Sequence, residues 1–118
     1  MMTVILHIGT NDLSMLGLKL DGAKVARQLV HQANNVMGIR AGITVAVSAI
    51  LPRLCDHPLS VSRRNVSRCN KKLSSLLPHH SFLDASSHFS SPSLFAPDML
   101  HLSVAGKQQL STLIGEYL

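Results

Sequence analysis

Short apolar segments alternate with amphipathic segments along this chain, and that alternation constrains its fold more than any other feature. The first two apolar segments are nearly continuous aliphatic runs, which is typical of strands buried on both faces of a parallel sheet. We predict strands over residues 3–8, 43–50 and 81–84, and helices over residues 22–37, 61–77 and 104–117. This order predicts an α/β fold in which right-handed crossovers place helices on both faces of the sheet.

Each predicted helix has an apolar stripe at three- and four-residue spacing and recognisable signals at its ends. Asp21 is suited to cap the start of the first helix, and Gly38 to follow its end. Pro78 ends the second helix, and Ser103 caps the third. The stripes consist of Val25, Leu29, Ala33 and Val36 in the first helix, Val66, Cys69, Leu73, Leu76 and Leu77 in the second, and Leu110, Leu113, Ile114 and Tyr117 in the third.

Length and composition favour one domain over residues 1–118. Hydrophobic residues make up 46% of the chain and charged residues 14%, which is enough apolar material for one core and too much for a disordered segment. No apolar run reaches the ~20 residues of a membrane span, and the first residues lack the pattern of a secretory signal. Cys55 and Cys69 share no motif, which predicts reduced thiols. We therefore expect a cytoplasmic protein.

A polar loop follows the first predicted strand and contains Gly9-Thr10-Asn11-Asp12. In doubly wound sheets, ligands bind beyond the carboxyl ends of the strands, where this loop is expected. Asn11 can donate hydrogen bonds from its side-chain amide to a developing oxyanion, and Gly9 lets a substrate approach the backbone. Taken alone, the tetrapeptide more often marks an ordinary Asx turn.

The second informative motif lies just before the last predicted helix and pairs Asp98 with His101. At this spacing the carboxylate can lie beside the imidazole and fix its tautomer, which leaves the other ring nitrogen as a general base. The remaining histidines, for which we expect only ordinary polar roles, are His7, His31, His57, His79, His80 and His88. The adjacent His79-His80 pair lacks Cys or carboxylate partners at ligand spacing, so we predict no metal site there.

Together, the two motifs resemble those of the SGNH (GDSL-type) hydrolase family. The resemblance is closest to single-domain esterase-like sequences in which a block "LHIGTNDL" precedes "ILPR" and then "D..HLS..G". Residues 50–53 read Ile-Leu-Pro-Arg, Asn70 matches as well, and Asp98 to Gly106 reproduces the last block. The resemblance extends from residue 3 into the last predicted helix.

The resemblance implies a three-layer α/β/α sandwich of flavodoxin-like type with a parallel sheet, of which this chain holds the C-terminal three strands and their helices. It also implies an ester hydrolase that passes an acyl group to serine and then to water, without metal or cofactor. On that basis His101 is the catalytic base, Asp98 orients it, and Asn11 is the oxyanion-hole donor. Gly9 and Asp12 shape the loop. The implied partner is a small-molecule ester.

The chain departs from the family at the nucleophile. SGNH hydrolases carry the nucleophilic serine in a GDS-like block, N-terminal to the block that begins here at Gly9. The chain has fifteen serines, and none lies in a GDS-like turn after a strand near the N-terminus. Ser14, Ser48 and Ser103 lie near a motif or at the end of a strand, but we assign none of them as a replacement. We therefore expect the nucleophile block to be missing from residues 1–118.

Two alternatives to catalysis stay open. The first is an inactive fragment or pseudo-hydrolase with the same fold. The second is a basic module that binds polyanions, because the formal net charge is +5 and five cations lie opposite the apolar stripe of the second helix. These cations are Arg63, Arg64, Arg68, Lys71 and Lys72.

The bland interpretation of this basic helix is a solvated surface. Aromatic residues make up only 3% of the chain, which argues against nucleic acid as a partner. The strand over residues 3–8 has no polar face, so an open edge on that strand would favour self-association.

Overall fold

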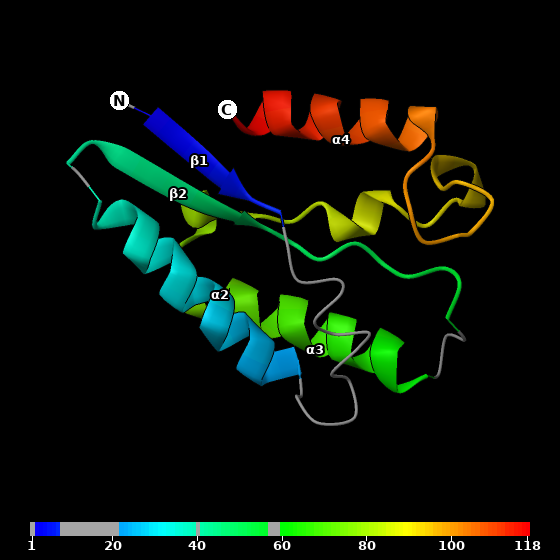
Figure 1. Cartoon of the computed structure of the whole chain (residues 1–118), viewed down its shortest axis with the longest axis horizontal. Coiled ribbons are helices and arrows are strands. Elements are labelled where there is room, and N and C mark those ends of the chain that lie inside the picture. Colours follow the sequence, from blue (N-terminus) through cyan, green and yellow to red (C-terminus); the bar gives the residue numbers. More distant parts are fainter. Residues whose placement is uncertain (1, 8–21, 40, 57–59) are drawn as a thin grey trace.

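A computed structural model describes residues 2–7, 22–39, 41–56 and 60–118 (Figure 1). Within these residues the chain forms a three-stranded sheet with the spatial order β1–β2–β3. The strands are β1 (Met2–Leu6), β2 (Ile43–Ser48) and β3 (Phe82–Leu83). Both pairings are parallel, with Leu6 opposite Val47 and Ser48 opposite Leu83. The predicted parallel α/β sheet is thereby confirmed, although each strand is shorter than predicted.

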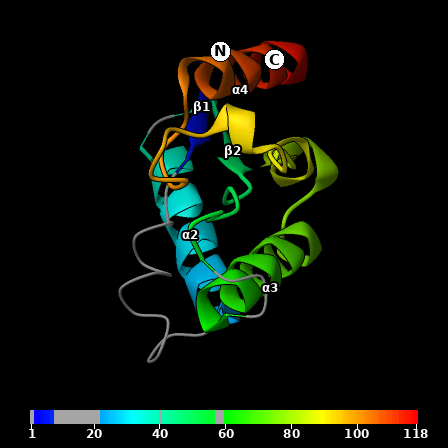
Figure 2. The same ribbon diagram turned by 90° about the vertical axis from the view of Figure 1, so that its right-hand side faces the viewer.

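Three α-helices in the described ranges connect or follow the strands: α2 (Gly22–Met37), α3 (Val61–Leu76) and α4 (Val104–Tyr117). Their bounds agree with the predicted ranges to within one residue. Helices α2 and α3 lie side by side against one face of the sheet, and α4 lies on the other side (Figures 1 and 2). The segment between β3 and α4 contains two short 3-10 turns, η2 (Ser86–His88) and η3 (Pro92–Leu94). A third, η1 (His79–Ser81), precedes β3.

The first core lies between the sheet and the α2/α3 layer. Leu29 of α2 and Leu73 of α3 are buried against Val45 and Val47, the alternate residues of β2 that point toward the helices. Alternate residues of a strand share one face of the sheet, so β2 presents Ala46 and Ser48 to the other side. The buried members of this core are Val25, Ala26, Leu29, Ala33, Val45, Val47, Ile50, Val66, Cys69 and Leu73.

The second core lies beneath α4 and is built mostly from irregular segments. Its buried residues are Leu51, Leu83, Ala85, Phe89 and Phe95. The rings of Phe89 and Phe95 meet edge to face, with centroids 6.5 Å apart. The predicted inward stripe of α4 packs against this cluster, as its half-buried residues Leu110, Leu113, Ile114 and Tyr117 show.

Two glycines allow close approach of helices to the rest of the chain. A Cβ atom on Gly22 would lie 2.1 Å from the backbone oxygen of Asn65, at the contact between α2 and α3. On Gly106 it would lie 1.9 Å from the backbone oxygen of Leu94, where α4 begins against η3. No side chain fits at such distances, so the packing of both helices depends on glycine at these positions.

The ends of two helices are capped by serine. The hydroxyl of Ser60 accepts a hydrogen bond from the Arg63 backbone N–H, and Ser103 accepts one from Gly106 in the predicted manner. Asp21, the predicted cap of α2, lies outside the described residues.

Two predictions for α3 are wrong. Leu76 is 41% exposed, because at the end of α3 it is Leu77, four residues after the buried Leu73, that packs against the first core. Arg63 is half-buried and does not lie with the solvated cations, because its guanidinium turns toward the segment after β2.

Among the helices described, none is both long enough and apolar enough to cross a membrane.

Candidate active site

Asp98 and His101 lie on a tight loop that joins η3 to α4. The loop is closed by a bridge between Phe95 and Leu102 and by backbone hydrogen bonds, including one from the Ala96 N–H to the His101 carbonyl at 2.8 Å. Met99, between the two residues, has a φ of +57° in the left-handed region, which reverses the chain direction. The loop therefore holds Asp98 and His101 on one side of a sharp turn.

Both oxygens of the Asp98 carboxylate are used. Oδ2 lies 2.6 Å from Nδ1 of His101, and Oδ1 accepts hydrogen bonds from the backbone N–H groups of Leu100 at 2.9 Å and His101 at 3.0 Å. The hydrogen bond to the His101 side chain, supported by the two backbone bonds, lowers the pKa of Asp98 to about 2. The carboxylate is therefore ionised at neutral pH and holds the imidazole in place.

The pairing specifies the role of each imidazole nitrogen. Nδ1 of His101 meets the carboxylate, so the neutral ring carries its proton there and leaves Nε2 unprotonated. The His101 side chain is 77% exposed, and among the residues that the structure describes none hydrogen-bonds to Nε2. An ionised carboxylate at Nδ1 and a free Nε2 are what a general base of the Ser-His-Asp type requires. The expected Asp98–His101 pair is present.

This loop lies at the carboxyl end of the sheet, beyond the arrowheads of β1 and β2 (Figure 1). The N–H of Cys55, in the segment that follows β2, donates to the Met99 carbonyl at 3.0 Å. Met99 and Leu102 pack against the second core on the inner side of the loop. Ligands of parallel α/β sheets bind at this edge, so the Asp98–His101 pair has a suitable location.

The predicted loop residues Gly9, Asn11 and Asp12 lie outside the described residues. The last described position before them is His7, which directly follows β1. Because β1 and β2 are parallel, β1 ends at the same edge of the sheet as β2.

His7 and Ser48 form a side-chain pair that sequence reasoning missed. Nδ1 of His7 lies 3.1 Å from Oγ of Ser48, a fully buried residue at the end of β2. Desolvation at this partly buried bond lowers the pKa of His7, so its ring is neutral at physiological pH. The parallel register of β1 and β2 is the signal that predicts this contact, because it places the residue after Leu6 beside Ser48. A single serine at the end of a strand carries no such signal.

The structure supports neither Ser48 nor Ser103 as a substitute nucleophile. Ser48 is 1% exposed, and its hydroxyl is engaged by His7 and the Ala49 carbonyl. Ser103 uses its oxygen to cap α4 and donates to the Ser93 carbonyl at 2.9 Å. Ser14 lies outside the described residues.

Both cysteines are free thiols, and burial raises the pKa of Cys69 to about 12, which keeps its thiol protonated.

Asn70 has a structural role rather than a catalytic one. Its side-chain amide pairs with the backbone of Ile50, accepting from the N–H at 2.7 Å and donating to the carbonyl at 2.8 Å. These two hydrogen bonds connect α3 to the start of the Ile-Leu-Pro-Arg segment. Arg53 continues the connection through an ion pair with Asp56 at 2.8 Å. Arg63 donates to the backbone carbonyls of both residues.

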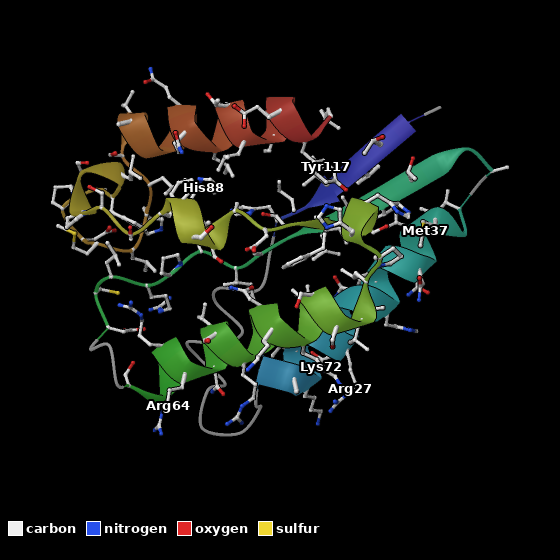
Figure 3. The ribbon with its side chains drawn as sticks, turned by 180° about the vertical axis from the view of Figure 1, so that it is seen from behind. Arg27, Met37, Arg64, Lys72, His88 and Tyr117 are labelled. Atoms are coloured by element: carbon white, nitrogen blue, oxygen red, sulfur yellow. The ribbon has the colours of Figure 1, made fainter. Side chains whose placement is uncertain are left out.

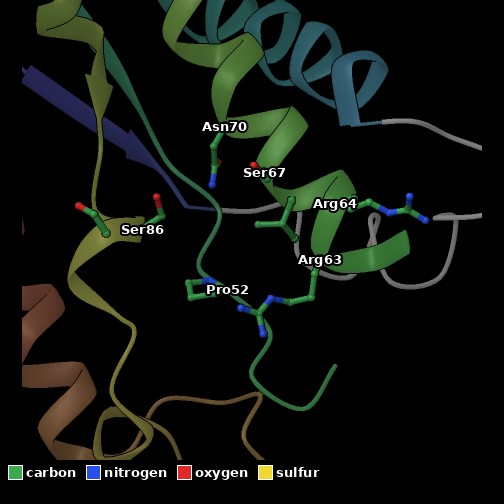
Figure 4. Close-up of a pocket in the computed structure, with 8 residues that line it drawn as sticks. Pro52, Arg63, Arg64, Ser67, Asn70 and Ser86 are labelled. Carbon is green, nitrogen blue, oxygen red and sulfur yellow. The ribbon is translucent and has the colours of Figure 1, made fainter. Parts of the chain in front are cut away.

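A cavity of about 480 Å³ lies between α3, the segment after β2, and η2 (Figure 4). Its lining residues are Pro52, Arg63, Arg64, Val66, Ser67, Asn70, Ser86 and Ser87. In Figure 4 the guanidinium of Arg64 points away from the cavity. Asp98 and His101 do not line it, so the cavity is not part of the candidate active site.

In the ranges 2–7, 22–39, 41–56 and 60–118, no group of three or more His, Cys, Asp or Glu residues is arranged to hold a metal ion. Comparisons with protein-family models, curated proteins and solved structures found no match.

Proposed function

We propose that this chain is the part of an SGNH-type serine ester hydrolase that carries the general base, its orienting acid and an oxyanion donor. The observation that supports the proposal is the contact between Asp98 Oδ2 and His101 Nδ1 at 2.6 Å, at the carboxyl edge of a parallel sheet. Surface Asp–His contacts also occur without catalysis. Here both carboxylate oxygens are engaged within a closed loop, which gives the imidazole one orientation.

In the proposed reaction, Nε2 of His101 accepts the proton of a serine hydroxyl as its oxygen attacks the ester carbonyl. Asp98 stabilises the resulting imidazolium, and Asn11 donates to the tetrahedral oxyanion. The imidazolium then returns its proton to the departing alkoxide, which leaves an acyl-serine and a free alcohol. Water attacks the acyl group with His101 as the base again, and the products are a carboxylic acid and the regenerated serine.

The proposal places the nucleophilic serine outside residues 1–118, because no serine of the chain lies in a GDS-like block and neither Ser48 nor Ser103 is free to act. The coding sequence upstream of Met1 is therefore the most informative observation. A strand that ends in a GDS-like turn there would supply the serine. Its absence would favour the alternative, a catalytically inactive relative of these enzymes.

The activity test uses the longest chain that the coding sequence defines, assayed for hydrolysis of p-nitrophenyl acetate and for labelling by a fluorophosphonate. We expect His101→Ala and Asp98→Asn each to lower turnover by about 10²–10⁴-fold, because each removes the general base or its orientation. His88→Ala is the matched control, since His88 is also an exposed histidine of the α4 side. Equal turnover in His101→Ala and His88→Ala would reject the proposal.

The 118-residue chain tests the geometry separately. Nitrogen NMR of neutral His101 should show the proton on Nδ1, and Asp98→Asn should abolish that preference. This chain is also expected to resist labelling by the fluorophosphonate, because no serine lies in a GDS-like block, Ser48 is buried and Ser103 is engaged in hydrogen bonds. Labelling that disappears in His101→Ala would instead show that a serine within residues 1–118 is the nucleophile.

A further inference from the structure

The outer surface of the α2/α3 layer carries a group of five cations, which we call the cationic face. It consists of Arg27 on α2 and of Arg64, Arg68, Lys71 and Lys72 on α3. Figure 3 shows Arg27, Arg64 and Lys72 on the side of the helix layer that faces away from the sheet. Lys72 is half-buried and the other four side chains are exposed. The sequence predicted one basic helix, and the fold adds a cation from a second helix.

The two helices that carry this face have no acidic residue of their own, since neither α2 nor α3 contains an aspartate or glutamate. Within the described residues, the salt bridges are those of Arg53 with Asp56 and of His101 with Asp98, so none involves the cationic face. Five positive charges on two helices that carry no acidic residue produce a positive potential, which attracts a partner of opposite charge.

The cations of α3 are arranged in a row. Arg64, Arg68 and Lys71 are four and three residues apart, so they lie on one line along the helix and span about 10 Å. Arg27 adds a charge on the neighbouring helix, which packs directly against α3. A row of charges with a second helix beside it suits a linear polyanion better than a single small anion.

The chemistry between the cations favours a phosphodiester backbone over a lipid surface. A helix that lies on a membrane needs large apolar side chains beside its cations, to enter the acyl region. On the cationic face the exposed neighbours are polar, among them Gln28 and Ser67. The exposed apolar residues Met37 and Leu76 instead lie at the last residues of α2 and α3.

The scarcity of aromatic residues limits the kind of nucleic-acid contact and does not exclude it. Stacking on bases needs aromatic rings, and α2 and α3 contain none. Contacts to phosphate need only Arg, Lys and polar donors, and they carry no sequence information. Arginine is well suited to this because its guanidinium binds phosphate oxygens in pairs.

We propose that the cationic face binds the phosphate backbone of nucleic acid without sequence preference. This inference does not depend on the proposed hydrolase activity, since the face lies on the opposite side of the sheet from α4 (Figure 2). Sequence-independent binding of this kind has dissociation constants of about 10⁻⁴–10⁻⁶ M at physiological salt.

The test is fluorescence anisotropy of a labelled 20-base-pair duplex with the 118-residue chain, over a range of salt concentrations. We expect binding that is equal for two unrelated sequences, with a slope of log K against log salt of about −3 to −4.5 for three to five phosphates. Arg68→Glu and Arg27→Glu should each weaken binding at low salt by about tenfold and lower the magnitude of the slope by about one.

Lys107→Glu is the matched control. It changes the net charge by the same amount, at an exposed position on α4. The proposal predicts that it changes the affinity by less than twofold. If Arg68→Glu lowers the melting temperature, Arg68→Gln takes its place and should still lower the slope.

Three results would overturn the proposal. The first is anisotropy that does not respond to salt. The second is equal weakening by Lys107→Glu and Arg68→Glu, which would show an effect of net charge alone. The third is tighter binding to vesicles that contain phosphatidylserine than to the duplex, abolished by Arg68→Glu, which would assign the face to membranes.

Discussion

The two faces of the sheet are built in different ways. On the α2/α3 face, helices and a strand supply a core at regular spacing, with residues such as Leu29, Leu73 and Val45. On the α4 face, much of the core comes from irregular chain between β3 and α4, including Phe89 and Phe95. The Asp98–His101 pair lies in that irregular region.

This difference suggests that one core mainly determines the stability of the fold, whereas the other determines the positions of Asp98 and His101. A regular helix-and-sheet core tolerates variation in its connections and mainly determines whether the chain folds. A core built from loops positions those loops directly, so its packing determines where Asp98 and His101 lie. The predictions below test whether the two faces are separable in this way.

The largest effects are expected from truncation of the cores. Phe89→Ala should lower the free energy of unfolding by about 3–5 kcal/mol, and Leu73→Ala by about 2–5 kcal/mol, because both side chains are fully buried. Urea denaturation measures these losses. Only Phe89→Ala should also shift the ring resonances of His101, since Phe89 packs on Phe95 at the base of the loop. A matching shift in Leu73→Ala would show that the faces are coupled.

A smaller effect is expected where α4 meets η3. Gly106→Ala places a Cβ atom against the backbone oxygen of Leu94, so the helix must move, at a cost of about 1–3 kcal/mol. Amide hydrogen exchange should accelerate between Leu94 and Ser103 and stay unchanged in α2. Gly115→Ala is the control, because its added Cβ would meet no atom within 4 Å and alanine favours helix. Equal destabilisation by both variants would contradict the close contact.

The two serine caps provide a matched pair with one member on each face. Ser60→Ala and Ser103→Ala should each cost about 1 kcal/mol, because each leaves a backbone N–H at a helix start without its acceptor. Ser103→Ala also loses the bond to the Ser93 carbonyl and should disturb the His101 resonances, whereas Ser60→Ala should not. If neither variant affects His101, the α4 cap does not hold the loop.

The smallest effect is the response to pH, and both parts of it follow from lowered pKa values. His7 has a folded pKa below the ordinary value of 6.5, so the unfolded chain binds more protons as pH falls through 6.5. The free energy of unfolding therefore decreases below that pH. We expect His7→Gln to remove this part of the pH dependence between pH 7.5 and 5.5 in urea denaturation. An unchanged slope would show that His7 is as solvated in the folded chain as in the unfolded one.

Asp98 responds to acid in a lower range of pH. Its pKa is lowered to about 2, so the bond to His101 persists below the ordinary carboxyl value of 3.8 and is lost as pH falls through about 2. Carbon NMR of the Asp98 carboxyl group measures this midpoint. His101→Ala should return it toward 3.8, because the largest cause of the shift is removed. A midpoint near 3.8 in the unmodified chain would contradict the contact.

Local patterns were enough to predict much of the fold. The limits of α2, α3 and α4, the cap at Ser103 and the inward stripe of α4 follow from periodicity and end signals within a few residues of chain. The same locality explains why the Asp98–His101 pair was predictable, since only three positions separate its members. The expected acyl-ester chemistry stays a prediction, because Gly9, Asn11 and Asp12 lie outside the described residues.

The predictions that failed concern positions where neighbours distant in sequence decide. Arg63 has the spacing of a surface cation, but its guanidinium donates hydrogen bonds to the backbone carbonyls of Arg53 and Asp56, which leaves it half-buried. Leu76 has the spacing of a core residue, but the next residue, Leu77, packs against the core in its place.

By itself, the sequence determined the order of strands and helices, the limits of the helices and the contact between Asp98 and His101. Each of these depends on residues a few positions apart, whose hydrogen bonds and side-chain directions follow from local backbone geometry. Only the tertiary structure decided that His7 meets Ser48, that Asn70 holds Ile50, and that α2 adds a cation beside those of α3. These contacts join residues 20 to 45 positions apart, and packing of the two cores brings them together.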